Sequence, residues 1–343
     1  MANSELTYEK KHEFNVGADL GFLHNRINLT FDWYKRNNFD LIGYIYTQGV
    51  GGEIGKWANV ASMKSHGAEF TLSTQNIVNR DFTWTTDLTF SYFKNKITDL
   101  KSRSNVLELV KQGSGSFREG YPAGSLFSIP FVGLTEDGLP QVINENGEVT
   151  TSDINFQEWE KLDFLKYEGT IDPPFNGGFG NNLRYKGFNL NIFFTYAFGN
   201  KLRLDPVFSS SYSDLSAMPR EFMDRWVAAG DEAHTNVPTI ASRRQVYNNS
   251  NISYGYNAYN YSTERVAKGD YIRLKEIALS YELPSTVTRA LRISSASVKL
   301  AATDLWLLYS DKKLHGQDPE FINSGGVATP NPKQFTFTLR FGL

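Results

Sequence analysis

The last ten residues, QFTFTLRFGL at positions 334–343, carry a large apolar side chain at every second position. Successive side chains of a β-strand point to opposite faces. One face of this segment is therefore apolar, and the other holds polar side chains and one glycine. The apolar set is Phe335, Phe337, Leu339, Phe341 and Leu343. A face of this size has to be covered either by a protein core or by a lipid bilayer.

The same period of two recurs along the whole chain and predicts nine strands, including the terminal one. Residues 187–199, GFNLNIFFTYAFG, give the clearest apolar stripe. Residues 271–284 and 295–309 each break the alternation once, which predicts a β-bulge or bend in both. The remaining strand candidates lie at 11–23, 26–35, 67–74, 81–93 and 173–185.

Short and long connections alternate strictly between these strands. Hairpin turns are expected at 24–25, 76–81 and 186–187 and in the ten or so residues after Pro284. Long loops are expected at about 47–62, 101–168, 199–270 and 310–333. A meander with short turns at one end and long loops at the other is the organisation of a transmembrane β-barrel. A soluble sandwich has loops at both ends.

Strand length and charge placement favour the membrane as well. The expected strands run for about 10–14 residues, whereas soluble strands average about 5–6 and tilted membrane strands need about 9–11. In the five best strands the apolar face carries no Asp, Glu, Lys or Arg. The predicted fold class is all-β, an antiparallel up-and-down transmembrane β-barrel segment. Bacterial single-chain barrels have even strand numbers, so further N-terminal strands are expected from elsewhere.

Composition excludes several classes of protein. The 343 residues carry a net charge of -2, which argues against a nucleic-acid partner. There is no cysteine, and 14% of the residues are aromatic, as in β-proteins. No run approaches the roughly 18 apolar residues of a membrane helix. The N-terminal MANSELTYEKK has no apolar core of a signal peptide, which fits either a cytoplasmic chain or the later part of a longer exported one.

Enzymatic and metal-binding motifs are missing. The five histidines, His12, His24, His66, His234 and His315, lack the spacing of a zinc site. Residues 51–57, GGEIGKW, are one residue short of a phosphate-binding loop. Residues 144–149, NENGEV, lack the ligands of a calcium loop and predict a hairpin turn at Asn146–Gly147. No catalysis, cofactor or metal is expected.

An ordered set of segments resembles the SusC/RagA family of TonB-dependent outer-membrane transporters. Each segment alone is weakly diagnostic, but together they follow the family's order over nearly the whole chain. The segments are 3–37, 119–149 (EGYPAGSLFSIPFVGLTEDGLPQVINENGEV), 172–201, 218–240 (MPREFMDRWVAAGDEAHTNVPTI), 269–284 (GDYIRLKEIALSYELP), HGQDPE at 315–320 and the terminal 331–343.

The resemblance implies a location and a set of partners. The family's barrel has 22 strands, so residues 1–343 are expected to form the last nine. The family's TonB box and plug domain have no counterpart here. The family imports oligosaccharides, and sometimes peptides, across the cell outer membrane. It works with a SusD-like surface lipoprotein as a lid and with energy from TonB. If Leu343 is periplasmic, the short turns are periplasmic and the long loops extracellular.

Two of the long-loop segments supply the candidate contact residues. Residues 214–231 predict a short helix with Met218, Phe222 and Trp226 on one face. That face either packs on the barrel rim or contacts the lid. Residues 246–264 are rich in tyrosine, asparagine and serine, which suits glycan contact, lid contact or an adaptable surface loop without a ligand. The candidates are Trp226, Tyr247, Tyr254, Tyr256, Tyr259 and Tyr261.

Two other interpretations compete with the transporter. A soluble secreted carbohydrate-binding β-sandwich would bury the apolar face against a second layer. An outer-membrane enzyme on a barrel scaffold would need a convergent catalytic set that the sequence does not present. The membrane interpretation requires lipid against residues such as Phe188, Ile192, Phe194 and Phe337.

Overall fold

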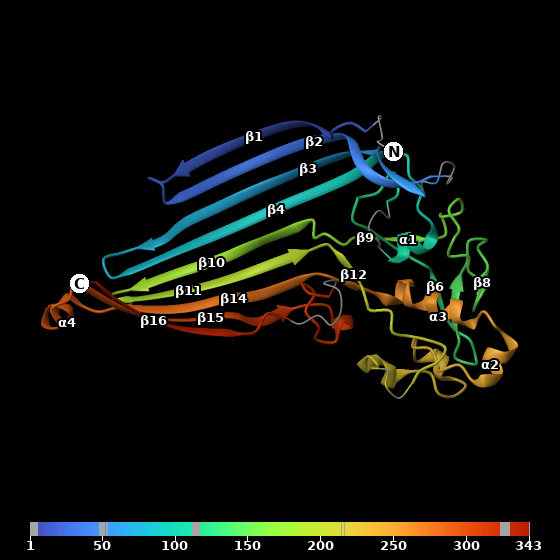
Figure 1. Cartoon of the computed structure of the whole chain (residues 1–343). Coiled ribbons are helices and arrows are strands. Elements are labelled where there is room, and N and C mark those ends of the chain that lie inside the picture. The colour runs from blue at the N-terminus through green and yellow to red at the C-terminus, as the bar shows by residue number, and fades with distance from the viewer. Residues whose placement is uncertain are drawn as a thin grey trace.

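A single antiparallel sheet of nine strands dominates the computed structural model, which describes residues 6–47, 52, 54–111, 117–213, 215, 217–322 and 330–342. The strands follow one another across the sheet in chain order (Figure 1). The predicted up-and-down topology and strand number are therefore confirmed. In sheet order the strands are β1 (Lys10–Phe22), β2 (Ile27–Tyr46), β3 (Gly55–Val78), β4 (Phe82–Leu100), β10 (Phe175–Tyr185), β11 (Phe188–Phe198), β14 (Tyr271–Glu282), β15 (Ser295–Tyr309) and β16 (Gln334–Gly342).

The strand register brings apolar side chains of neighbouring strands onto one face. Phe31 pairs with Phe70, and Phe70 with Phe90. The rings of Phe70 and Phe90 stack with centroids 5.2 Å apart. Such cross-strand aromatic pairs each stabilise a sheet by a few tenths of a kcal/mol to about 1 kcal/mol. Among the described residues β1 and β16 each pair on one side only, so this sheet is not closed on itself.

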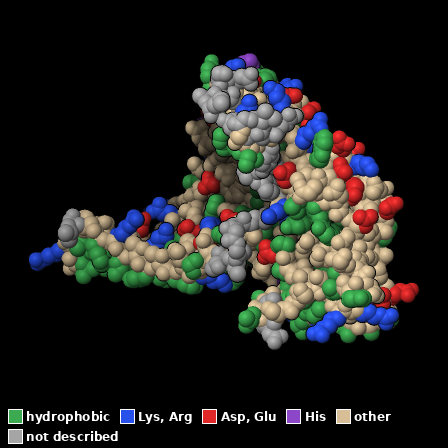
Figure 2. Space-filling model, turned by 45° about the vertical axis from the view of Figure 1, so that its right-hand side comes forward, with side chains coloured by type: hydrophobic (Ala, Val, Ile, Leu, Met, Phe, Trp, Pro, Cys, Tyr) green, Lys and Arg blue, Asp and Glu red, His purple; other side chains and the backbone are tan. Residues whose placement is uncertain are grey.

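The apolar face of the sheet is uncovered. Phe188 is 48% exposed and Phe337 is 61% exposed. Ile192 and Phe194 are half-buried between strand neighbours. No described helix or second sheet packs over β11 or β16, and Figure 2 shows hydrophobic side chains gathered along this face. Further exposed side chains of the face are Phe14, Val16, Leu20, Phe22, Phe31, Trp33, Phe179, Leu279, Leu300, Phe335, Leu339 and Phe341.

The connections alternate in length as predicted, with one correction. The short turns span 23–26, 79–81, 186–187 and 283–294, and the last contains α4 (Ser285–Ala290). The first long loop is shorter than the predicted 47–62, because β2 and β3 continue their pairing to Tyr46 and Gly55. An edge-to-face contact of Tyr44 and Trp57, with centroids 5.6 Å apart, extends this hairpin. No described helix is long and apolar enough to cross a membrane.

Both predicted register breaks are present. The pairing of β14 with β11 and with β15 shifts around Lys275, which forms a bulge. The Lys275 ammonium is paired with the Asp304 carboxylate across the two strands. Asp304 has φ +54°, a left-handed conformation that Asp tolerates better than most residues. The bulge keeps Glu276 and Arg273 on the same, polar face of the sheet despite their odd spacing.

The long connections fold into a second body at one end of the sheet (Figure 1). The second long loop, between β4 and β10, contains α1 (Val106–Lys111), β5 (Ser125–Ser128), β6 (Phe131–Leu134), β7 (Pro140–Ile143), β8 (Val149–Thr150) and β9 (Lys166–Thr170). The third, between β11 and β14, contains β12 (Lys201–Arg203), η1 (Arg220–Asp224), η2 (Asp231–Ala233), α2 (Arg243–Asn248), α3 (Ile252–Asn260), η3 (Thr263–Arg265) and β13 (Val266–Lys268). The fourth, between β15 and β16, contains η4 (Lys312–Leu314). The hairpin predicted at Asn146–Gly147 joins β7 to β8, with Gly147 at φ +80°.

Buried side chains lie mainly in this outer-loop body. One cluster joins α1, β5 and β7 around Val106, Phe127 and Val142. Another joins Phe208 to Ile252, Tyr256 and Tyr259 of α3. The molecule therefore buries its apolar groups in the outer loops and exposes them on the sheet.

Candidate functional site

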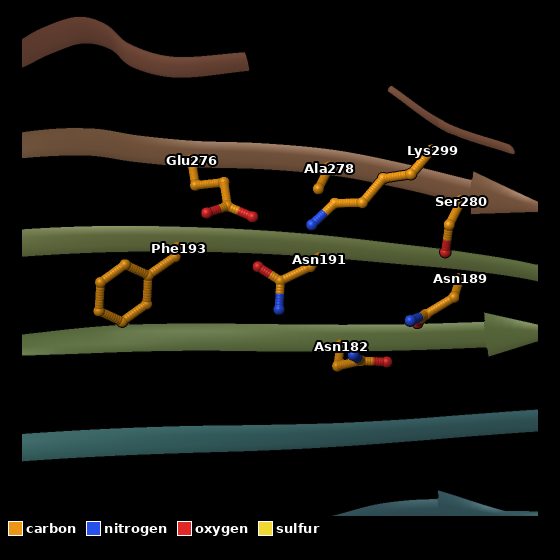
Figure 3. Close-up of a pocket in the computed structure, with 8 residues that line it drawn as sticks. All are labelled: Asn182, Asn189, Asn191, Phe193, Glu276, Ala278, Ser280 and Lys299. Atoms are coloured by element: carbon orange, nitrogen blue, oxygen red, sulfur yellow. The ribbon is translucent and has the colours of Figure 1, made fainter. Parts of the chain in front are cut away.

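A polar cavity of about 420 Å³ lies on the face of the sheet opposite the apolar one. Its side chains come from β10, β11, β14 and β15 (Figure 3). They occupy the alternate positions that the apolar side chains leave free, as in the pair Asn182 and Asn191. The residues that line it are Asn182, Asn189, Asn191, Phe193, Glu276, Ala278, Ser280 and Lys299.

The polar groups of this cavity are suited to binding rather than to bond cleavage. The Oδ1 atom of Asn189 is buried and has no hydrogen-bond partner among the described residues. Lys299 reaches over Ala278 with its ammonium directed along the strands (Figure 3). Asparagine amides both donate and accept hydrogen bonds, so three of them with one cation and one carboxylate can hold a ligand rich in hydroxyl or amide groups. No Ser, His and carboxylate converge here to form a nucleophile and its base.

None of the candidate residues predicted from the sequence lines this cavity. The sequence feature that indicates the cavity is NLNIFF at 189–194, where asparagines alternate with residues of the apolar stripe. The missing information was the pairing of β11 with β10 and β14, which brings Asn182 and Ser280 alongside. The described residues contain no cluster of three or more His, Cys, Asp or Glu that could hold a metal ion.

The outer loops above the sheet are fixed by a buried arginine. Arg203 of β12 donates hydrogen bonds to the carbonyl oxygens of Ser262 (2.7 Å) and Phe127 (2.6 Å) and to the Ser128 hydroxyl (3.0 Å). Burial lowers the pKa of Arg203 to about 10, so the guanidinium remains charged at neutral pH. One cation therefore links the second long loop, between β4 and β10, to the segment that follows α3.

The six candidate contact residues separate into exposed and buried groups. Tyr247 on α2 is 91% exposed. Tyr254 is also exposed, and its ring lies 6.3 Å from that of Phe156. Tyr261 is half-buried and packs against the cluster around Phe127. Tyr247 and Tyr254 can reach a partner or ligand without any rearrangement.

Tyr256 and Tyr259 are not surface contacts. Both are buried in the α3 cluster, and burial raises the pKa of each phenol well above its ordinary value. The Tyr256 hydroxyl donates a 2.5 Å hydrogen bond to the Thr239 carbonyl oxygen, and the Tyr259 ring packs edge-on to Phe208. The segment 246–264, expected as an adaptable loop, is partly the helix α3. Tyr256 and Tyr259 are three residues apart on this helix, so both rings lie on its buried face.

The helix predicted over 214–231 is wrong for most of its length. Among the described residues of this stretch, Arg220–Asp224 form one turn of 3₁₀ helix, and a second short one begins at its last residue, Asp231. Arg225 is extended with ψ 153°, and the Trp226 amide donates to the Val237 carbonyl oxygen instead of continuing a helix. The stretch forms a turn around Trp226 because these contacts to distant residues outweigh local helix propensity. Asp214 and Ser216, near the start of the predicted helix, lie outside the described residues.

Trp226 occupies a defined place in that turn. Its ring lies against Gly138, where φ is +75° and an added Cβ would approach the ring to 2.5 Å. Its indole NH donates to Glu232 Oε2 at 2.9 Å. The ring is partly exposed and packs on the outer-loop body at Gly138, and a role for Trp226 in lid or substrate contact stays a prediction.

Acidification is expected to release the Trp226 turn. The hydrogen bond from Trp226 lowers the pKa of Glu232, and those from the amides of Ala228 and Val227 lower the pKa of Asp231. A lowered folded pKa stabilises the turn above the ordinary carboxyl pKa of about 4. That stability is lost as pH falls through the lowered values. The fluorine resonance of 5-fluorotryptophan at Trp226 should shift below about pH 4, and Glu232→Gln should remove most of the shift. A shift centred above pH 5, or none down to pH 3, would contradict this assignment.

Comparisons with known proteins agree with the fold. No family model matches the chain. It is 25% identical to TonB-dependent receptor P3 of Formosa agariphila over 344 residues, which cover 93% of this chain and 31% of that receptor. It is 24% identical to TonB-dependent receptor SusC of Bacteroides thetaiotaomicron, over 99% of this chain and 32% of that receptor. The chain thus spans about a third of the length of the curated relatives it matches.

A solved structure resembles the chain in fold. The structure of the RagAB peptide transporter superposes with a TM-score of 0.75 at 22% identity, covering 99% of this chain and 36% of that one. The sequence relatives are named as receptors and not as enzymes, in agreement with the expected lack of catalysis. The relatives and the fold point the same way: over nearly its whole length, the chain is similar to about a third of a TonB-dependent receptor of the SusC type.

Proposed function

We propose that this chain is part of an outer-membrane active transporter that imports oligosaccharides or peptides. The observation that carries the proposal is the two-sided sheet, with an exposed apolar face and a polar face holding a 420 Å³ cavity. The apolar face suits lipid and the polar face suits a hydrated path for a nutrient. The curated relatives are TonB-dependent receptors, which supports TonB as the source of energy, acting through parts of the receptor other than this chain.

The soluble β-sandwich is the weaker alternative. It requires a second layer over Phe188, Leu300 and Phe337, and the described part of the chain supplies none. Leaving such a surface in water would expose far more contiguous apolar area than soluble monomers carry. Lipid is therefore the better cover.

Uptake of a nutrient tests the proposal. In the source bacterium, deletion of the gene should abolish growth on the imported nutrient, and the intact gene should restore it. The double variant Asn191→Leu/Lys299→Met should lower the uptake rate about tenfold or more, because two polar contacts worth about 1 kcal/mol or more each are removed. Arg340→Met, on the polar face outside the cavity, is the matched control. Unchanged growth on every nutrient after deletion would overturn the proposal.

A surface lipoprotein of the SusD type is the proposed partner at the outer loops. Exposed apolar side chains there suit such a contact and include Leu215, Met223, Val227 and Tyr247. Exposed aromatic and apolar residues of this kind dominate the energy of protein interfaces.

Tyr247 provides the test of the lid interface. Tyr247→Ala should weaken co-purification with the lipoprotein by about tenfold, the effect of losing a contact worth about 1–2 kcal/mol. Folding should be unaffected, since the side chain is exposed. Tyr185→Ala removes an exposed tyrosine near the short-turn end of the sheet and should leave the association unchanged. Equal effects of the two variants would exclude the outer loops as the lid interface.

A further inference from the structure

A second cavity, of about 390 Å³, lies where the outer loops join the sheet. Tyr271 and Ala197, which pair across β14 and β11, form part of its floor. They occupy the same polar face as Asn191, six residues farther along β11. At about 3.3 Å per residue the two cavities are roughly 20 Å apart along the strands. The second cavity, called here the mouth cavity, therefore precedes the Asn191 cavity on the way in from the outer loops.

The polar side-chain atoms at the mouth cavity are mainly hydrogen-bond acceptors. Two carboxylates, those of Asp172 and Glu320, line it, and no Lys or Arg does. The Asp172 carboxylate has no hydrogen-bond or ion-pair partner in the described part of the chain. Apolar surface from Leu202 and Pro319 completes the walls. These carboxylates would repel an anion. A neutral ligand would leave the Asp172 carboxylate without a positive partner.

Asn200 adds a third acceptor in a fixed orientation. The side chain is only 7% exposed, and its Oδ1 is buried without a partner. Its Nδ2 donates to the Ile171 carbonyl oxygen at 3.2 Å. Exchanging Oδ1 and Nδ2 by an amide flip would place Oδ1 against that carbonyl oxygen, and neither atom could donate. The amide also lies flat on Gly269, where an added Cβ would meet Nδ2 at 2.2 Å. Such an orphan acceptor is costly and calls for a donor from a ligand.

Nearby charge keeps the mouth cavity negative. Glu320 and Asp318 share one cation, Arg273, at 3.1 Å and 2.6 Å. These three groups sum to -1, and Asp172 brings the sum to -2. A protonated amine supplies the missing charge and up to three donors. Its N–H groups can donate to the carboxylates of Asp172 and Glu320 and to Asn200 Oδ1, which all belong to residues that line the cavity.

We propose that the mouth cavity binds a protonated amino group of the imported nutrient. The inference rests on the proposed import function and specifies the chemical class of the cargo. A peptide amino terminus or lysine and an amino sugar both carry this group. Uncharged sugars and N-acetylated ligands do not.

Calorimetric binding to the receptor purified in detergent from outer membranes tests the proposal. The probes are trialanine and its N-acetyl form, and a glucosamine trimer and its N-acetyl form. At least one free amine should bind about tenfold or more tighter than its acetylated partner, the effect of a charge-assisted hydrogen bond. The pair that responds identifies peptide or amino sugar as the source. Asp172→Asn should abolish the preference, and Glu136→Gln, which changes an exposed acid in the β6–β7 turn outside the cavity, should retain it.

Three results would overturn the assignment: equal affinity for free and acetylated probes, no binding of either free amine, or a preference that survives Asp172→Asn. Folding of each variant is checked by the heat-dependent electrophoretic mobility of the barrel. Equal affinity for free and acetylated probes, with growth lost on deletion of the gene, would overturn the amine site and leave import standing. Unchanged growth on every nutrient after deletion, with the amine preference present, would overturn import and leave the amine site standing.

Discussion

Replacing Arg273 with alanine is expected to lower the free energy of unfolding by about 3–5 kcal/mol, because it leaves a buried carboxylate without its cation. Arg273 of β14 and Asp318 are both almost completely buried. One guanidinium nitrogen contacts both Asp318 oxygens at 2.6 Å, and Glu320 adds a third contact at 3.1 Å. This cluster attaches the last long loop to the sheet. Urea unfolding of the detergent-solubilised receptor, followed by tryptophan fluorescence, measures the loss.

Two further variants make the Arg273 prediction specific. Arg340→Ala, on an exposed arginine of the same face, should change the free energy of unfolding by less than about 0.5 kcal/mol. Arg273→Ala/Asp318→Ala should recover part of the loss, because removing both charges leaves less uncompensated charge buried. If Arg340→Ala costs as much as Arg273→Ala, the cluster does not hold the loop.

Lysine at Phe337 is expected to destabilise the folded receptor by about 2–4 kcal/mol, the cost of a cation near the middle of the bilayer. Phe337 lies opposite Leu300 in the β15–β16 pair, and both side chains are exposed on the apolar face. In water the same change would be nearly neutral, because an exposed surface position tolerates charge. Unfolding in lipid vesicles therefore distinguishes lipid from water as the medium.

Thr336→Lys is the matched control for Phe337→Lys. Thr336 precedes Phe337 on β16 and points to the polar face. Its substitution should cost less than about 0.5 kcal/mol, since the new ammonium remains hydrated. Equal costs at the two positions would mean that the faces do not differ in their surroundings.

The sheet was predictable because its information is local. Apolar alternation in each segment specifies a strand with two unlike faces, and the turn lengths order the strands. The bulges at Lys275 and Asp304 were visible as breaks in that alternation. Strand ends were less predictable, as in β2 and β3, because pairing beyond Asn59 depends on the partner strand as much as on the sequence.

The outer loops were poorly predictable because their structure depends on distant contacts. Helix α3 contains Gly255 and two asparagines, Asn257 and Asn260, which are weak helix formers. It is stabilised by burial of Tyr256 and Tyr259 and by the hydrogen bonds of Asn260 to the Phe208 backbone. Composition indicated contact chemistry in this segment but could not separate buried rings from exposed ones. For the same reason the Asn191 cavity could not be predicted from one segment, because its lining comes from four strands that only the sheet pairing brings together.

The central claim, that lipid covers the apolar face, is tested most directly by spin labels along β11. The chain contains no cysteine, so single cysteines can be introduced cleanly. For nitroxides at positions 189–194 in vesicles, the accessibility to oxygen and to a water-soluble nickel complex should alternate from one residue to the next. Labels at Leu190, Ile192 and Phe194 should be accessible to oxygen and shielded from a water-soluble nickel complex, and labels at Asn189 and Asn191 should respond in the opposite sense. Equal access of nickel to both sets, or shielding of Ile192 and Phe194 from both reagents, would contradict the account.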